Sequence, residues 1–259
     1  MAEEEQKIPQ YLYHYGKVDE EHPEYTEAIF TKNEIFFDSP LNYNDPFDTK
    51  IHYALEGTDD EKISFLKKDY QKTHPDIPEE DIILSKPVSD ITKLCINNIN
   101  KKADEYIRGR VGIFCLCEEK NNILMWSHYA DSHMGFCLEF LTKNDFFGNA
   151  RPVNYCKKMP VYNRLKKPSS EDEETKIFLA KAEGWDYEKE WRFAKFDSGV
   201  EPFPPEALTG VIFGYKIAPE NKEKIINWCR QRNPRPQLYN AVPKESEYGL
   251  DIVPFDYPA

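Results

Sequence analysis

The chain has 259 residues and carries 34 basic against 46 acidic side chains, a formal net charge of −12. Hydrophobic residues make up 40% of it and aromatic residues 14%, which excludes a disordered chain. The longest apolar runs, such as residues 111–117, fall far short of the roughly 20 residues that span a bilayer. The N-terminal sequence MAEEEQK is acidic where a secretory signal is basic and then apolar, so we expect a cytoplasmic protein with no membrane partner.

The six cysteines and the acidic balance disfavour two further classes. Disulfide frameworks are typical of small secreted scaffolds, so we expect reduced thiols. Cys115 and Cys117 have no second pair at zinc-finger spacing, which favours core packing over metal binding. A protein that coats duplex DNA is basic overall, unlike this one. Residues 151–167 hold six basic side chains and no acidic one, and they fit either a solvated loop or a surface for nucleic acid.

Apolar periodicity predicts an α+β fold in a single domain, residues 1–259, with a helical insertion at about 60–108. The runs typical of strands are 10–15, 34–38, 111–117, 135–141, 188–196, 210–213, 236–242 and 250–255. The patterns typical of helices cover 60–73, 79–108, 122–132, 171–183 and 219–231.

Three segments place unusual polar residues on or beside predicted strands. They are YLYHYG with His14, the segment 123–140 that contains MWSHYA and Glu139, and WDYEKEWRF at 185–193. Ser127 and His128 are adjacent, so on a helix they point about 100° apart and cannot form a nucleophile and its base. The sequence therefore disfavours a serine hydrolase.

The third segment predicts a pair of carboxylates. Residues two apart on a strand share a face, so Glu188, Glu190 and Arg192 would project together. Two close carboxylates raise each other's proton affinity, which suits acid/base chemistry or the stabilisation of a developing cation. The alternative is a solvent-facing salt bridge between Arg192 and Glu190.

Taken in order, the islands LYHYG, IFFDSPLNYNDPFD, FCLCEEKNNILMWSHYADSHMGFCLEF, VNY and WDYEKEWRF resemble a bacterial and phage family catalogued as domain of unknown function twenty-nine seventy-one. More distantly, they resemble the ADP-ribosyltransferase fold. That resemblance implies a mixed or antiparallel split sheet and a glycosyltransferase-class enzyme that uses NAD. It also implies a macromolecular acceptor, protein or nucleic acid, in a phage-defence or toxin-like role.

In that fold a first-strand His binds the ribose of NAD, a later strand and helix stack on nicotinamide, and a strand-borne Glu completes the site. Carried over to this sequence, the resemblance makes Glu190 and Glu188 catalytic. The cofactor-binding residues it implies are His14, Tyr15, Ser39, Phe114, Trp126, Ser127 and Tyr129. Phe114 stands where many of these enzymes have Tyr, and it can stack but cannot donate a hydrogen bond.

Cleaving the bond between nicotinamide and ribose builds positive charge on the sugar, as in glycoside hydrolysis, and Glu190 would stabilise it. We therefore expect the strands that carry His14, Phe114 and Glu190 to converge on one cleft. We also expect Glu190→Gln to remove NAD consumption while leaving the fold intact.

Two other classes stay open. A metal-dependent nuclease could draw hard oxygen ligands and a cation from Asp45, Glu139, Glu190 and Lys143. A non-enzymatic sensor or interaction module on a degenerate transferase fold would account for Phe114. The NDPFD loop could line the mouth of a site or simply form a turn through Asn44, Asp45 and Asp48.

Overall fold

The computed structural model describes residues 7–19, 21–50, 52–166 and 178–258, without the side chains of 103–107. The chain forms two compact units, described here one at a time. Unit 1 comprises residues 1–39, 111–153 and 184–259, and unit 2 comprises residues 40–110 and 154–183. Helices and strands occur together in both units, so the predicted α+β class is confirmed. The prediction of a single domain stays a prediction.

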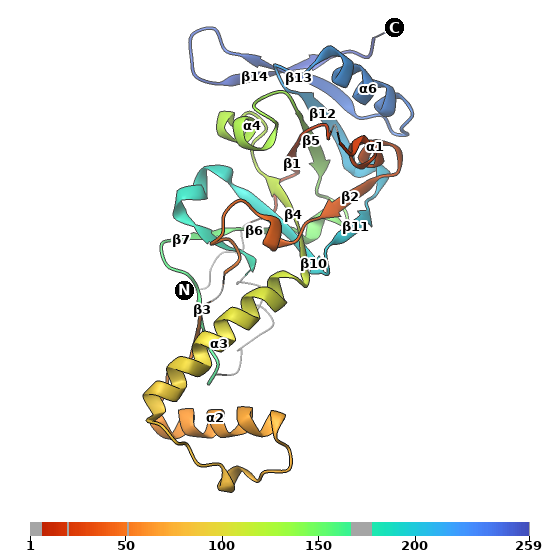
Figure 1. The fold of residues 1–259 in the computed structure, drawn as a ribbon. Helices are drawn as coiled ribbons and strands as arrows, with labels where there is room; N and C mark the ends of the chain where they lie inside the picture. The colour runs from red at the N-terminus through yellow and green to blue at the C-terminus, as the bar shows by residue number, and fades with distance from the viewer. Residues whose placement is uncertain (1–6, 20, 51, 167–177, 259) are drawn as a thin grey trace. The chain divides into compact units, whose positions relative to one another are not determined.

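Unit 1 is built on an eight-stranded mixed sheet in the order β14-β13-β12-β5-β1-β4-β10-β6 (Figure 1). Within it β12 and β13 run parallel, whereas the other pairs are antiparallel. The strand bounds are Tyr11–Gly16 (β1), Val111–Cys117 (β4), Phe136–Leu141 (β5), Arg151–Pro152 (β6), Glu190–Phe196 (β10), Leu208–Phe213 (β12), Gln237–Pro243 (β13) and Leu250–Phe255 (β14).

The pairing between β1 and β4 is short. β1 pairs along its whole length with β5, and β4 pairs along its whole length with β10, but β1 and β4 share only the pair Tyr13↔Cys117. The sheet is therefore joined at one register position and opens beyond it.

The helices of unit 1 are α1 (Pro23–Thr31), α4 (Ile123–Tyr129) and α6 (Pro219–Arg230); its short 3₁₀ turns are η3 (Phe147–Asn149), η4 (Glu183–Glu188) and η5 (Pro205–Ala207). A small sheet pairs β2 (Glu34–Phe37) with β11 (Gly199–Pro202). Asn122 caps α4, because its Oδ1 accepts from the backbone N–H groups of Leu124 and Met125. Three left-handed residues at 131–133 then end the helix and return the chain to β5.

Two hydrophobic clusters pack against opposite faces of the large sheet. Side chains alternate along a strand, so Leu12 and Tyr13 of β1 point to opposite faces. The first cluster contains Leu12, Phe114 and Trp191 together with Phe30 of α1 and buried residues of α6. The second contains Tyr13 and Cys117 together with Trp126 of α4. The register of β1, β4 and β10 therefore decides which face each candidate residue occupies.

Unit 2 contains two long helices, α2 (Asp59–Thr73) and α3 (Val88–Arg108), which confirm the predicted helical insertion. A capping box between Thr58 and Glu61 starts α2. The other elements are η1 (Pro40–Asn42), η2 (Glu79–Asp81), and the short strands β3 (His52–Ala54), β7 (Asn154–Cys156), β8 (Val161–Asn163) and β9 (Ala180–Ala182). β3 pairs with β8, and β7 pairs with β9.

The predicted elements are mostly confirmed, with four corrections. The helix predicted at 79–108 begins only at Val88, and the helix predicted at 122–132 ends at Tyr129. Of the helix predicted at 171–183, residues 171–177 lie outside the described residues and 180–182 form strand β9 instead. The strand predicted at 188–196 begins only at Glu190. No helix in the described part of the chain combines the length and the apolarity needed to cross a membrane.

Candidate functional site

Glu188 and Glu190 lie on either side of a sharp change in backbone direction. Glu188 is the last residue of η4, Glu190 is the first residue of β10, and Lys189 between them is left-handed, with φ +44°. The prediction that both project from one strand is therefore wrong, because Glu188 is outside the strand. Both carboxylates are nevertheless buried, with 2% and 4% of their surface exposed.

Glu190 forms an ion pair with Arg192, two residues along β10. Nε of Arg192 donates to Oε1 at 2.7 Å and Nη2 donates to Oε2 at 3.0 Å, so both carboxylate oxygens are engaged. This confirms that Glu190 and Arg192 share a face. The predicted alternative placed this salt bridge in solvent, but Arg192 is only 1% exposed. Two-point geometry of this kind fixes the orientation of the Glu190 carboxylate.

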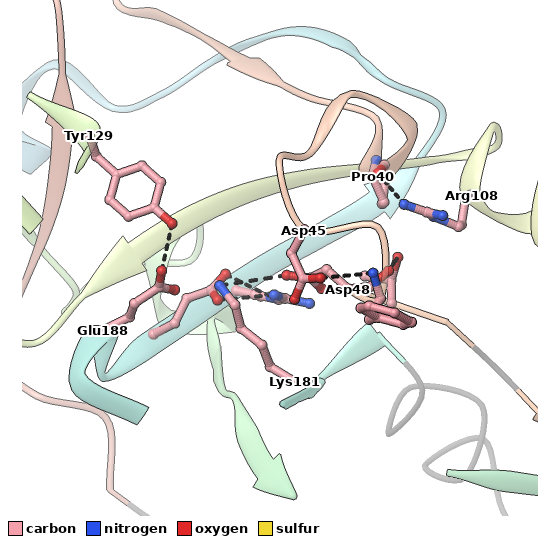
Figure 2. Close-up of polar contacts among 11 residues, drawn as sticks. Pro40, Asp45, Asp48, Arg108, Tyr129, Lys181 and Glu188 are labelled. Carbon is pink, nitrogen blue, oxygen red and sulfur yellow. Dashed lines mark hydrogen bonds and ion pairs between the residues drawn. The ribbon is translucent and has the colours of Figure 1, made fainter. Parts of the chain in front are cut away.

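Glu188 is held by a different kind of donor. The phenol of Tyr129, the last residue of α4, donates a hydrogen bond of 2.5 Å to Oε1 of Glu188 (Figure 2). The two residues come from separate sequence motifs and are 59 positions apart. The contact thus joins the predicted nicotinamide-side helix to the predicted carboxylate pair.

The polar loop 118–122 organises this region and was not predicted to do so. Tyr15 Oη donates to the Glu119 carbonyl at 2.6 Å, and Trp126 Nε1 donates to the Lys120 carbonyl at 3.0 Å. Asn122, besides capping α4, donates from Nδ2 to the Tyr187 carbonyl of η4 at 2.7 Å. The loop therefore ties β1, α4 and η4 together. Its run of polar residues directly after a buried strand is the only signal that could have shown this role.

A further buried carboxylate, Glu139 of β5, lies on the same face. Its Oε1 accepts from the Thr209 hydroxyl at 3.0 Å, and its Oε2 accepts from Tyr13 Oη at 3.3 Å and from Lys120 Nζ at 3.5 Å. Burial, and then the charge of Glu139, raise the pKa of Tyr13, so this phenol stays protonated as a donor. Lys120 also lies over the rings of Tyr13 and Tyr239.

His14 and Phe114 lie against the opposite face of the sheet. Their rings stack with centroids 4.4 Å apart, and Phe114 belongs to the first cluster, where it contacts Phe37 and Phe140. Nδ1 of His14 donates to the Cys115 carbonyl at 2.9 Å. Burial lowers the pKa of His14, so the neutral imidazole is favoured.

The strand register explains this separation. Glu190 pairs with Cys117 of the second cluster, whereas Phe114 pairs with Phe193 on the other face. The structure thus places the three strands side by side in the order β1-β4-β10, but it directs His14 and Phe114 away from the carboxylates. The expectation that these three positions meet in one cleft is therefore wrong for the side chains of His14 and Phe114, whereas a ribose-binding role for His14 stays a prediction.

The remaining predicted cofactor residues are divided in the same way. Tyr15 and Trp126 are on the carboxylate side, with ring centroids 5.3 Å apart. Ser127 is exposed on α4. Ser39 follows β2, whose Phe37 packs in the first cluster, and its backbone N–H donates to Asp38 Oδ1 at 2.8 Å.

The NDPFD loop belongs to unit 2 and forms a turn. Asp45 Oδ1 accepts from the backbone N–H of Phe47 at 2.8 Å, which is the turn role expected for this sequence. In the same unit Asp48 and Lys181 form a buried ion pair of 3.5 Å, and Arg108 Nη2 donates to the Pro40 carbonyl at 2.6 Å (Figure 2). Among the described residues, no group of three or more His, Cys, Asp or Glu side chains could hold a metal ion.

The basic stretch 151–167 is partly engaged within unit 2. Lys157 pairs with Glu183 at 3.6 Å, and the Arg164 guanidinium lies over the rings of Tyr53 and Phe65. Lys167 lies outside the described residues. Binding of nucleic acid by this stretch stays a prediction.

A comparison with protein families finds one match. The family described as "Protein of unknown function (DUF2971)" matches residues 125–193, which include α4, β5 and the start of β10. The matched segment contains Tyr129, Glu188 and Glu190 but neither His14 nor Phe114. No curated protein and no solved structure matches the chain.

Proposed function

We propose that the chain is an ADP-ribosyltransferase-like enzyme that cleaves the nicotinamide–ribose bond of NAD and transfers ADP-ribose to a macromolecular acceptor in the cytoplasm. The observation that carries this proposal is the hydrogen bond between Tyr129 and Glu188. The resemblance assigns these two residues to the nicotinamide side and to the carboxylate pair of one site. Their direct contact is what a shared site requires, and both lie in the segment that matches the family.

The chemistry follows from two fixed, buried carboxylates. When the C1′–N bond breaks, its electron pair leaves with neutral nicotinamide and positive charge develops on the ribose, which a nearby carboxylate stabilises. A nucleophilic O–H or N–H of the acceptor then forms the new bond to C1′ and loses its proton. Arg192 fixes both oxygens of Glu190, which suits a residue that orients the ribose. Glu188, held by a neutral phenol, suits the acceptance of that proton.

The test is mass-resolved product formation from NAD incubated with purified protein, with and without candidate protein and RNA acceptors. Glu188→Gln should lower transfer of ADP-ribose to the acceptor roughly 100-fold, the lower end of the range for removing a positioned general base, and should lower NAD hydrolysis without an acceptor by less. Tyr129→Phe should lower transfer by about tenfold, because one hydrogen bond to a charged group is lost. Glu201→Gln is the matched control. It removes a carboxylate of β11 that pairs with Lys195 of β10, away from Tyr129 and Glu188, and it should leave turnover unchanged. Full transfer by Glu188→Gln would refute the assignment.

A second candidate, a non-enzymatic module on a degenerate fold, is favoured by one observation. Phe114 stands where a hydrogen-bonding Tyr would be, and it is packed in the core with only 4% of its surface exposed. This candidate is distinguished by calorimetry. Saturable binding of NAD, or of a macromolecular partner, with no nicotinamide released would support the module and end the enzymatic proposal.

A further inference from the structure

A pocket of about 390 Å³ lies in unit 1 between α6 and the C-terminal segment that follows β14, away from the carboxylate group. Its apolar wall is formed by Pro219 and Ile226 of α6, by Phe255 at the end of β14, and by Pro258 of the C-terminal segment. Its volume lies in the range of small-molecule sites. Lys222 and Arg230 supply its two cations, and Glu223 also lines it.

Lys222 is held by neutral groups. Nζ donates to Asn240 Oδ1 at 2.7 Å and lies 4.1 Å from the ring centroid of Phe255 and 5.0 Å from that of Phe213. Burial lowers the pKa of this ammonium group, because its charge is partly removed from water. An anion placed beside it would offset that cost.

Arg230 is in a similar position. Nη1 donates to Asn227 Oδ1 at 3.0 Å, and Nη2 donates to the Pro258 carbonyl. Among the described residues, no carboxylate lies within ion-pair distance of Arg230 or Lys222, although acidic side chains outnumber basic ones by 46 to 34. Two cations whose hydrogen bonds in the described structure go to neutral oxygens, beside an apolar wall, are an arrangement complementary to an organic anion.

We propose that this pocket binds a small organic anion, with a carboxylate or phosphate at the cations and an apolar body on the wall. Lys222, Ile226 and Arg230 are spaced i, i+4 and i+8, so they lie along one side of α6 over about 12 Å. The anionic group sits at Lys222, the partly buried cation, and the apolar body lies against Ile226 and Phe255. The site is independent of NAD chemistry at Glu188.

The experiment measures binding of phenyl phosphate and benzoate to the full chain by calorimetry and ligand-detected NMR. Inorganic phosphate carries the anionic group without an apolar body, and benzyl alcohol carries the apolar body without an anionic group. We expect saturable binding of both organic anions by the parent protein. Inorganic phosphate and benzyl alcohol should each bind at least tenfold more weakly.

Three variants locate the site. Lys222→Met keeps an unbranched apolar stem on the two Phe rings, and Arg230→Gln keeps a hydrogen-bond donor, so both should fold; near-ultraviolet circular dichroism checks this. Lys222→Met should weaken phenyl phosphate binding at least tenfold, and Arg230→Gln should weaken it less, because Arg230 lies about two helical turns away. Lys224→Met, an exposed cation of the same helix that does not line the pocket, should bind like the parent. The proposal is overturned if the parent binds neither organic anion at millimolar concentration, if Lys222→Met binds unchanged, or if inorganic phosphate binds as well as phenyl phosphate.

Discussion

Glu190→Gln should destabilise unit 1 as well as change its chemistry. In the structure Arg192, 1% exposed, meets both oxygens of Glu190 through Nε and Nη2. Gln keeps one acceptor oxygen but removes the negative charge and places an amide NH₂ against a guanidinium donor. Removing one member of a buried ion pair costs about 3–5 kcal/mol, because the other charge stays buried. Native proteins have only about 5–15 kcal/mol of stability in total, so about a fifth of it or more is at stake.

The assay is urea unfolding at pH 7, followed by tryptophan fluorescence. Glu190→Gln and Arg192→Met should each lose about 3 kcal/mol or more, whereas the double variant should lose less than the sum of the two because both charges of this pair are removed together. The double-mutant cycle therefore yields a coupling of at least about 2 kcal/mol. A loss below about 0.5 kcal/mol for Glu190→Gln, in the range of ordinary surface substitutions, would refute the reasoning.

This changes how a loss of activity at Glu190 is interpreted. The sequence predicts that Glu190→Gln leaves the fold intact, but the buried pair with Arg192 makes a partly unfolded variant the expected result. Turnover of Glu190→Gln must therefore be measured well below its own unfolding midpoint. Glu188→Gln is a second test of the chemistry, because the amide oxygen can still accept the hydrogen bond from the Tyr129 phenol.

Three further outcomes are expected. Asn122→Ala should lower the free energy of unfolding in urea by about 2 kcal/mol, because it removes the cap of α4 and the hydrogen bond to η4. Asn122→Ser keeps a capping oxygen and should lose only about half as much. Equal losses in the two variants would contradict this. Burial lowers the pKa of His14, so below about pH 6.5 the unfolded chain binds more protons than the folded one, and the free energy of unfolding falls as pH falls. His14→Gln should reduce the slope of the free energy of unfolding against pH by up to about 1.4 kcal/mol per pH unit. An unchanged slope between pH 5 and 6.5 would count against this. Burial raises the pKa of Cys117 to about 12 and that of Cys137 well above its ordinary value, so a thiol reagent at pH 8 should label both only as fast as the chain unfolds; prompt labelling would show that they are accessible thiolates.

Elements with strong periodicity could be predicted from the sequence. The run at residues 111–117 is continuously apolar, and it forms β4 with the predicted bounds. Helices α2 and α6 begin and end within a residue of their predictions, because acidic starts and prolines mark their ends. The strands of two or three residues, such as β7 and β9, could not be predicted, since their pairing depends on partners far along the chain.

The sequence could predict which strands carry the candidate residues, but not which face of the sheet each side chain occupies. The sequence motifs indicated the three strands that carry His14, Phe114 and Glu190, and these strands are neighbours in the sheet. Whether two side chains meet depends on register, because a slip of one residue moves every side chain to the other face. Nor could the sequence show that Lys189 is left-handed, which is uncommon for a residue other than glycine and which takes Glu188 out of the strand.

The short pairing between β1 and β4 bears on whether His14, on the face opposite the carboxylates, takes part in NAD binding. Beyond the single pair Tyr13↔Cys117, the Cys115 carbonyl accepts from the His14 imidazole, so a side chain bonds across the opening. His14 therefore bridges the two strands from the face opposite the carboxylates. If NAD extends from Glu188 into this opening, His14→Gln should raise the KM for NAD several-fold with kcat little changed, because His14 would bind the cofactor away from the bond that breaks. If His14 only supports the sheet, stability should fall while KM stays unchanged, and the NAD site is then confined to the face that carries Tyr129 and the two carboxylates.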